Sequence, residues 1–326
     1  MRILSLDGGG YLGLATAAFI AETERHFEVA CHESFDMFCG TSTGAIIALA
    51  LASGMSGKEI IALYQDFGAK VFRNSYPGSR LLRTVRSIFI SRYSNQPLKD
   101  ALRDSFGDMT LGDIKAKGKF VLITAFSVTT GKPRIFKTDH SADLTRDDGY
   151  FVRDIALASA AAPVYLPVVQ LRAPVNGSEE WYCDGGVFAN HPALLGYAEA
   201  LSHLAIASED VHILSLSTPR ADLSERASAR SMLQQYLLSR GLISWGTKLA
   251  GVMIDSTSMI AHETLRRLIS WQAESDAKYV RIMLDKPRGV DIDVATRKAT
   301  ETLMQIGSEK AYSTEVRNQI APFFRS

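Results

Sequence analysis

The chain has 326 residues, 46% of them hydrophobic, which is enough to bury a large core as one α/β domain or as two smaller ones. Its 36 basic and 35 acidic residues leave a net charge of +1, so overall charge predicts no nucleic acid polymer as a partner. The three cysteines form no Cys-x-x-Cys pair, which argues against a disulfide scaffold and favours a reducing compartment such as the cytoplasm.

Short apolar runs typical of buried strands alternate with segments of helical periodicity, and this alternation predicts a layered α/β fold. The predicted strands are 2–6, 35–39, 119–126, 133–137, 180–184, 211–217 and 278–284. The predicted helices are 11–28, 44–53, 56–72 and 192–206. The stretch 224–275 interrupts the strand pattern and is almost wholly helical in character, which predicts a helical insertion near the C-terminus. No apolar run is long enough to cross a bilayer, so we expect membrane contact to be peripheral.

The first glycine-rich segment, "LDGGGYLGL", directly follows the first predicted strand and precedes a predicted helix. Gly8, Gly10 and Gly13 have the spacing G-x-G-x-x-G, which is typical of a loop that holds a dinucleotide pyrophosphate. Successive glycine N–H groups at a helix N-terminus also bind other anions, including the oxyanion of an acyl-transfer reaction. The motif alone leaves both interpretations open.

The second segment, "FDMFCGTSTGAIIALA", places Gly40-Thr41-Ser42-Thr43-Gly44 between a predicted strand and a predicted helix. This is the G-x-S-x-G pattern of a nucleophile elbow, in which small neighbours permit a strained turn that exposes the serine Oγ. A helix N-terminus beneath the serine stabilises negative charge on it. The pattern predicts Ser42 as a nucleophile.

The third segment, "WYCDGGVFANHP", contains Asp184 at the end of a predicted strand, followed by Gly185 and Gly186. A carboxylate at that place can project into a crevice and accept a proton, although Asp-Gly pairs also occur as simple turns. His191 offers a Ser-His-Asp triad as a rival to a direct Ser42–Asp184 pair. The dinucleotide interpretation requires an acidic residue at the end of a second strand, and no convincing candidate follows the glycine loop.

Asp7-Gly8-Gly9-Gly10, Gly40-x-Ser42-x-Gly44 and Asp184-Gly185-Gly186 resemble, in order, the three signature blocks of patatin-like phospholipases. The resemblance implies a three-layer α/β/α sandwich and a serine lipid acyl hydrolase of the phospholipase A type, which cleaves membrane glycerophospholipids without metal or cofactor. It also implies a Ser42/Asp184 dyad and an oxyanion hole made by the backbone N–H groups of Gly8, Gly9 and Gly10.

The helical stretch 224–275, followed by "YVRIML", resembles the C-terminal part of bacterial patatin-like effectors that cyclic dinucleotides activate in anti-phage defence (CBASS). This second resemblance implies a cyclic dinucleotide as activator, and a cytoplasmic enzyme that is peripheral to the inner membrane when active. A homo-oligomer is compatible with it. The alternative is a constitutive lipase or esterase without nucleotide control.

The absence of internal repeats, low-complexity tracts and long linkers predicts one domain over 1–326. Within it we expect a catalytic core at 1–220, a helical insertion at 221–277, and a returning strand with a C-terminal helix at 278–326. The stretch Arg73–Arg92 holds five arginines and no acid, which suits either a helix on an anionic membrane, a solvated surface helix or a phosphate-binding segment.

Overall fold

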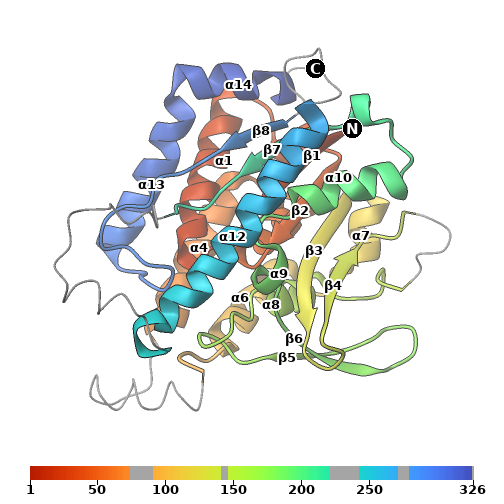
Figure 1. The fold of residues 1–326 in the computed structure, drawn as a ribbon, viewed down its shortest axis with the longest axis vertical. Coiled ribbons are helices and arrows are strands. Elements are labelled where there is room, and N and C mark those ends of the chain that lie inside the picture. Colours follow the sequence, from red (N-terminus) through yellow and green to blue (C-terminus); the bar gives the residue numbers. More distant parts are fainter. Residues whose placement is uncertain (74–90, 141–145, 221–241, 271–278, 325–326) are drawn as a thin grey trace, which may run out of the picture.

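The computed structural model describes residues 1–73, 91–140, 146–220, 242–270 and 279–324 (Figure 1). In these ranges the strands are β1 (Arg2–Leu6), β2 (Met37–Thr41), β3 (Phe120–Ser127), β4 (Lys132–Lys137), β5 (Val169–Arg172), β6 (Glu179–Asp184), β7 (His212–Leu216) and β8 (Tyr279–Ile282). The helices are η1 (Gly10–Leu12), α1 (Gly13–Phe27), α2 (Cys31–Ser34), α3 (Thr43–Ser53), α4 (Gly57–Arg73), α6 (Gln96–Phe106), α7 (Leu111–Ala116), α8 (Val152–Ser159), α9 (Gly186–Ala189), α10 (Ala193–Ser202), η2 (Ser208–Asp210), α12 (Leu242–Ser270), α13 (Arg297–Tyr312) and α14 (Thr314–Phe324).

The strands form a mostly parallel sheet in the order β5-β6-β3-β2-β1-β7-β8, with β4 also paired to β3. The run from β3 through β2, β1 and β7 to β8 is parallel throughout. Both β4 and β6 pair with β3 in the antiparallel sense, and β5 pairs antiparallel with β6. The sheet therefore has a parallel part of five strands and an antiparallel margin.

Side chains along each parallel strand alternate between two separate cores, as the two-residue period of a strand requires. On β1, Leu4 and Leu6 belong to a large cluster shared with α1, α3, α4 and α13, whereas Ile3 belongs to a second cluster with α10 and α12. Figure 1 shows α10 and α12 in front of the sheet and α1 and α4 behind it. The predicted three-layer α/β/α architecture is confirmed.

Most predicted elements occur with boundaries shifted by one or two residues, and the predicted strand at 35–39 runs from Met37 to Thr41. Strand β5 was not predicted, because its four residues, VQLR, form a segment too short to show a reliable two-residue period. In the predicted helical insertion, α12 is a helix as expected, while 224–241 and 271–275 lie outside the described residues. Residues 74–90 of the arginine-rich stretch also lie outside them.

All three cysteines, Cys31, Cys39 and Cys183, are free and buried. None of the helices in the described ranges combines the length and the hydrophobicity that a membrane-spanning segment needs.

Candidate active site

Ser42 occupies a sharp turn between the end of β2 and the start of α3. Its backbone has φ 56° and ψ −128°, a conformation that costs a non-glycine residue free energy and persists only where the surroundings enforce it. The Ser42 N–H donates to the Ser159 Oγ at 2.9 Å, and the Ser159 hydroxyl donates to the Thr124 carbonyl at 2.7 Å. Ser159 of α8 therefore fixes the turn to the neighbouring strand β3.

Small residues let this turn pack against the end of β1. A Cβ at Gly44 would lie 2.6 Å from the Asp7 carbonyl oxygen, so only glycine permits this close approach. A Cβ at Gly40 would lie 2.6 Å from the Ala45 Cα within the turn itself. The Thr41 hydroxyl donates to the Ala189 carbonyl at 2.6 Å, which links the turn to α9.

The register of β3 brings Ser42 and Asp184 together. Strand β4 pairs along one edge of β3. Strands β2 and β6 both pair along the opposite edge, β2 with the first part of β3 and β6 with its last part. Strand β2 ends with Thr41 opposite Thr124, and antiparallel β6 ends with Asp184 opposite Ala125. Strands β2 and β6 run in opposite directions and end at adjacent β3 residues, so Ser42, the residue after β2, lies within hydrogen-bond reach of Asp184, the last residue of β6.

Asp184 is buried and hydrogen-bonded in a way that suits a general base. Burial raises the pKa of its carboxyl group to about 6, and hydrogen bonds from the Ser42 side chain and the Gly186 N–H partly offset this rise. The Gly186 N–H donates to the Asp184 Oδ1 at 2.6 Å, which orients the carboxylate. A Cβ at Gly185 would lie 2.5 Å from the Thr124 carbonyl oxygen, so the turn after Asp184 is packed tightly on β3.

We expect the pH profile of kcat/KM for ester hydrolysis to report this carboxyl group. Asp184 accepts a proton only when ionised, so kcat/KM should fall about tenfold per pH unit below pH about 6 and level off above it. Hydrolysis of a soluble nitrophenyl ester between about pH 4.5 and 8 tests this expectation. A profile that stays flat down to pH about 5 would mean that another group takes the Ser42 proton.

The glycine loop lies directly beside Ser42. A Cβ at Gly8 would lie 2.8 Å from the Ser42 Cβ. The Gly8 N–H donates to the Asn190 carbonyl at 3.3 Å, so it is already used within the protein. In the described part of the chain, the N–H groups of Gly9 and Gly10 have no protein acceptor. Gly9 and Gly10 are therefore the donors that remain for an oxyanion, whereas Gly8 was predicted to donate as well.

Thr43 is the first residue of α3. Its carbonyl oxygen accepts a hydrogen bond from the Tyr64 hydroxyl at 3.0 Å. Its own hydroxyl is buried and has no partner among the described residues. Thr43, Thr41 and Gly40 support the turn, and none of their described contacts involves the Asp184 carboxylate.

His191 lies outside the Ser42–Asp184 pair. Its Nδ1 is 3.0 Å from the Asp7 Oδ1, and its Nε2 is 3.1 Å from the Tyr279 hydroxyl. Both ring nitrogens are thus engaged in a buried cluster around Asp7. This arrangement favours the dyad over the Ser-His-Asp triad that sequence alone left open.

Arg220 and Arg281, the charged partners of Asp7 in that cluster, were not predicted from the sequence. Both guanidinium groups contact the Asp7 carboxylate, which is fully buried. Asp7 is the residue in the sequence that could have indicated these arginines, because an acidic residue at the end of an apolar strand requires a charged partner when it is buried. The positions of those partners depend on the pairing of distant strands.

The geometry gives no support to the dinucleotide interpretation. A dinucleotide fold places an acidic residue at the end of the second strand to bind the ribose. Here β2 ends at Thr41 and leads straight into Ser42.

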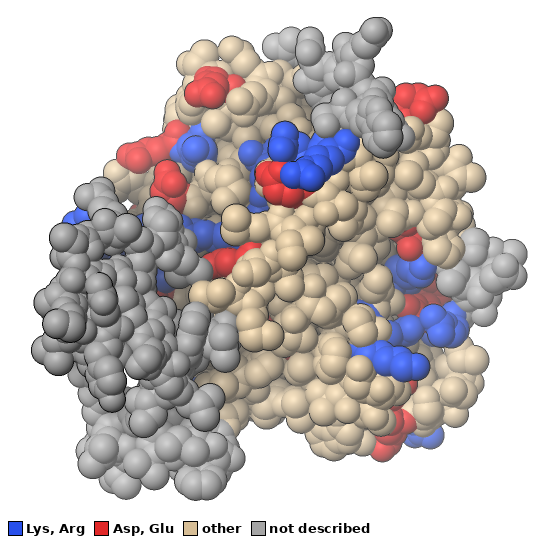
Figure 2. Space-filling model, in the orientation of Figure 1, with Lys and Arg blue, Asp and Glu red and all other residues tan. Residues whose placement is uncertain are grey.

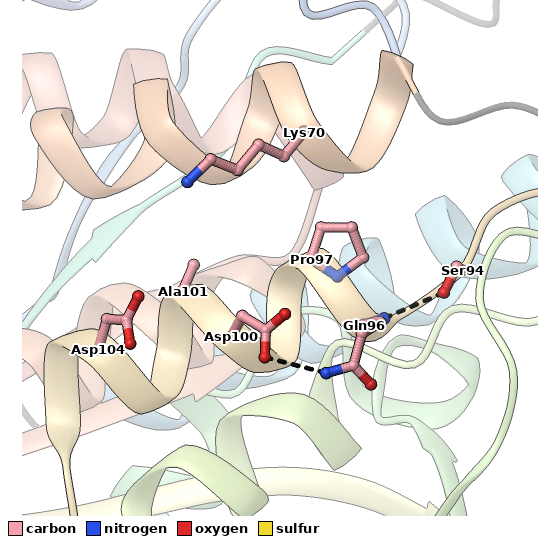
Figure 3. A pocket seen from close by; sticks show the side chains of 7 residues that line it. All are labelled: Lys70, Ser94, Gln96, Pro97, Asp100, Ala101 and Asp104. Atoms are coloured by element: carbon pink, nitrogen blue, oxygen red, sulfur yellow. Dashed lines mark hydrogen bonds between the residues drawn. The ribbon is translucent and has the colours of Figure 1, made fainter.

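Two surface pockets lie apart from Ser42 and Asp184. One, of about 410 Å³, lies between α4 and α6 (Figure 3). Its Lys70 is paired with Asp66 at 2.6 Å, and its Asp100 accepts a hydrogen bond from Gln96 at 2.9 Å. The other, of about 680 Å³, is lined by α8, β5 and the loops next to them. Neither pocket is lined by Ser42 or Asp184.

Comparison with known proteins gives one family and several relatives that match most of this chain. The sequence model of the family described as "Patatin-like phospholipase" matches residues 4–197. A "cGAMP-activated phospholipase" of Pseudomonas aeruginosa is 32% identical over 82% of this chain and 75% of its own. Proteins of the same description from Escherichia coli and Vibrio cholerae are each 30% identical, over 94% and 100% of this chain and 86% and 94% of their own.

Proposed function

This chain belongs to the patatin-like phospholipase family and is a carboxylic ester hydrolase, and we propose that its Ser42/Asp184 dyad cleaves ester bonds of membrane glycerophospholipids under the control of a cyclic dinucleotide. The observation that carries the proposal is the head-to-head meeting of β2 and β6 on β3. It places a buried carboxylate against a serine held in a strained turn. The Gly9 and Gly10 N–H groups, which have no acceptor among the described residues, follow Gly8, whose position is next to Ser42.

The proposed reaction has two halves. The Ser42 Oγ adds to the ester carbonyl carbon while Asp184 takes its proton, and the Gly9 and Gly10 N–H groups hold the resulting oxyanion. Collapse of the tetrahedral adduct expels the alcohol, which takes the proton from Asp184 and leaves the acyl group on Ser42. Asp184 then deprotonates a water molecule, which attacks the acyl carbonyl carbon. Collapse of this second adduct breaks the bond to the Ser42 Oγ, which takes the proton back from Asp184, and the fatty acid is released.

Exposed apolar side chains support contact between the enzyme and a phospholipid bilayer. On α12, Met253, Ile260 and Leu268 are exposed and, from their spacing, share one face of the helix. Helix α12 packs against α9, which begins two residues after Asp184. Figure 2 shows one group of charged side chains over the upper end of α12 and a mostly uncharged surface below it. A bilayer on this face would contact a helix that packs on the segment directly following Asp184.

Activation by a nucleotide is supported by the relatives alone. Three relatives that match this chain over most of its length carry the description "cGAMP-activated phospholipase". An intracellular enzyme that hydrolyses phospholipids would damage the membrane of its own cell if it were always active. A ligand that binds the active state more tightly than the inactive one removes this hazard by shifting the population. Such control would suit a role in anti-phage defence.

The test is fatty acid release from phosphatidylethanolamine and phosphatidylglycerol vesicles, with cGAMP and other cyclic dinucleotides titrated separately. We expect one of them to raise the rate about tenfold or more and to produce binding heat in calorimetry. Ser42→Ala should bind the nucleotide with the same heat and release no fatty acid. Equal hydrolysis across the titration, without binding heat, would leave a constitutive lipase.

A further inference from the structure

Asp7, the residue directly before the glycine loop, is the centre of a buried cluster of charged and polar side chains. Burial by itself would raise the pKa of Asp7, but Arg281, His191 and Arg220 hold it well below its usual range. The Arg281 guanidinium donates to the Asp7 Oδ2 at 2.6 Å and to the Ser215 hydroxyl at 2.6 Å. The carboxylate is therefore charged and fixed in one place.

Arg220 connects this carboxylate to α12. One of its nitrogens donates both to the Asp7 Oδ2 at 2.9 Å and to the Ser258 hydroxyl at 3.1 Å. Its other terminal nitrogen lies 3.5 Å from the Asp255 carboxylate. Ser258 and Asp255 belong to α12, so one guanidinium group joins this helix to the residue that begins the glycine loop.

A second chain of contacts runs between the same two elements. His262 of α12 lies with its Nδ1 2.7 Å from the Tyr279 hydroxyl. The same hydroxyl is 3.1 Å from the Nε2 of His191, whose Nδ1 is 3.0 Å from the Asp7 Oδ1. Two independent routes thus lead from α12 to Asp7.

We infer that Arg220 is a positioning residue of the reaction. Through its contact with Asp7 it holds the glycine loop in position, and through its contacts with α12 it makes the position of the loop depend on the position of that helix. This inference rests on the proposed role of Ser42 and the glycine loop. A rigid carboxylate next to Gly8 fixes where the following N–H groups point, and misplaced donors stabilise the oxyanion poorly. A ligand that displaced α12 would reach the loop by the same contacts.

The experiment compares two serines of α12, of which Ser258 is buried and contacts Arg220 and Ser256 is exposed. The Ser258 hydroxyl also donates to the Ile254 carbonyl at 2.9 Å, a contact that a change of Arg220 leaves in place. Ser258→Ala removes the hydroxyl that contacts Arg220, and Ser256→Ala removes an exposed hydroxyl two residues away, with the same change of helix propensity. We expect Ser258→Ala and Arg220→Gln to lower kcat for a soluble nitrophenyl ester about threefold to thirtyfold with KM changed less than about twofold. Ser256→Ala should match the wild type, and Arg220→Lys, which keeps the charge next to Asp7, should recover part of the loss.

A second readout separates positioning from stability. The rate at which a fluorophosphonate ester modifies Ser42 depends on the oxyanion donors, and we expect it to fall in parallel with kcat at temperatures well below unfolding. If Ser258→Ala and Arg220→Gln lower the unfolding temperature but keep wild-type kcat and labelling rates, the two side chains are only structural and the inference is wrong. Should Arg220→Gln fail to fold, Ser258→Ala decides the question. Ester hydrolysis that survives in Ser42→Ala would instead overturn the proposed active site.

Discussion

Replacing Asp184 by asparagine is expected to lower kcat about 10⁴-fold or more, because an amide cannot take the proton of the Ser42 hydroxyl. Ser42→Ala should be at least as severe. Since nucleophile and base act as one unit, the double variant should be little worse than either single variant. Steady-state hydrolysis of a soluble ester and of phospholipid vesicles measures these values. A tenth or more of wild-type kcat in Asp184→Asn would mean that Asp184 is not the base.

The stability of the same variant serves as the control for misfolding. The folded-state pKa of Asp184 is raised to about 6, so its buried charge destabilises the native state above that pH and this cost disappears as the carboxyl group is protonated at lower pH. Asparagine never carries the charge and can still accept the Gly186 N–H. We expect Asp184→Asn to unfold with a free energy about 3 kcal/mol higher than the wild type at pH about 8, and with little difference at pH about 4. A variant that is more stable and inactive separates catalysis from folding.

Gly10→Ala is expected to lower kcat about 10²-fold to 10³-fold, the usual effect of losing an oxyanion donor. Gly10 has φ +59°, which a Cβ disfavours, and an added Cβ would also collide with the Ile292 backbone oxygen. The loop must therefore shift, and the Gly9 and Gly10 N–H groups shift with it. The measurement is kcat together with the unfolding temperature.

Gly131→Ala provides a matched control for this substitution. Gly131 has φ +65° and nothing within 4 Å of an added Cβ, so alanine costs backbone strain there without a collision. It lies in the turn between β3 and β4, away from Ser42 in the chain. We expect Gly131→Ala to be destabilised and to keep wild-type kcat. Similar losses of kcat in both variants would show that strain alone, and not the position of the loop, reduces activity.

The proposed nucleophile, the proposed base and the glycine loop are all visible in the sequence because each depends on neighbouring residues only. A strand followed by G-x-S-x-G and an apolar helix specifies a sharp turn by local sterics, and the observed φ of 56° at Ser42 agrees with it. Asp184 was identified in the same way, from an apolar run that ends in Asp-Gly-Gly. Local patterning also predicted the strands that alternate between the two cores.

The orientation of the strands was decided by tertiary structure. Asp184 was predicted to project into a crevice from the end of its strand, but the direction of that strand was not predicted. Strand β6 runs antiparallel to β3 and reaches Ser42 from the opposite direction to β2. Tertiary structure also decided which N–H groups of the glycine loop are engaged within the protein. The Gly8 N–H donates to the carbonyl of Asn190, which is more than 100 residues away in the chain. No local pattern specifies which edge of β3 each strand occupies.

The amino-acid sequence by itself determined which residues we propose for the chemistry, and the tertiary structure decided which side chains hold them in place. Arg281 meets Asp7 across 274 residues of sequence, because β8 pairs with β7 and β7 pairs with β1. A strand's register is set by burial of its side chains on both faces of the sheet, which is a property of the whole core. The partners of a buried charge are therefore determined only when the sheet is assembled. A strained turn with small neighbours depends on five consecutive residues and can be predicted from them.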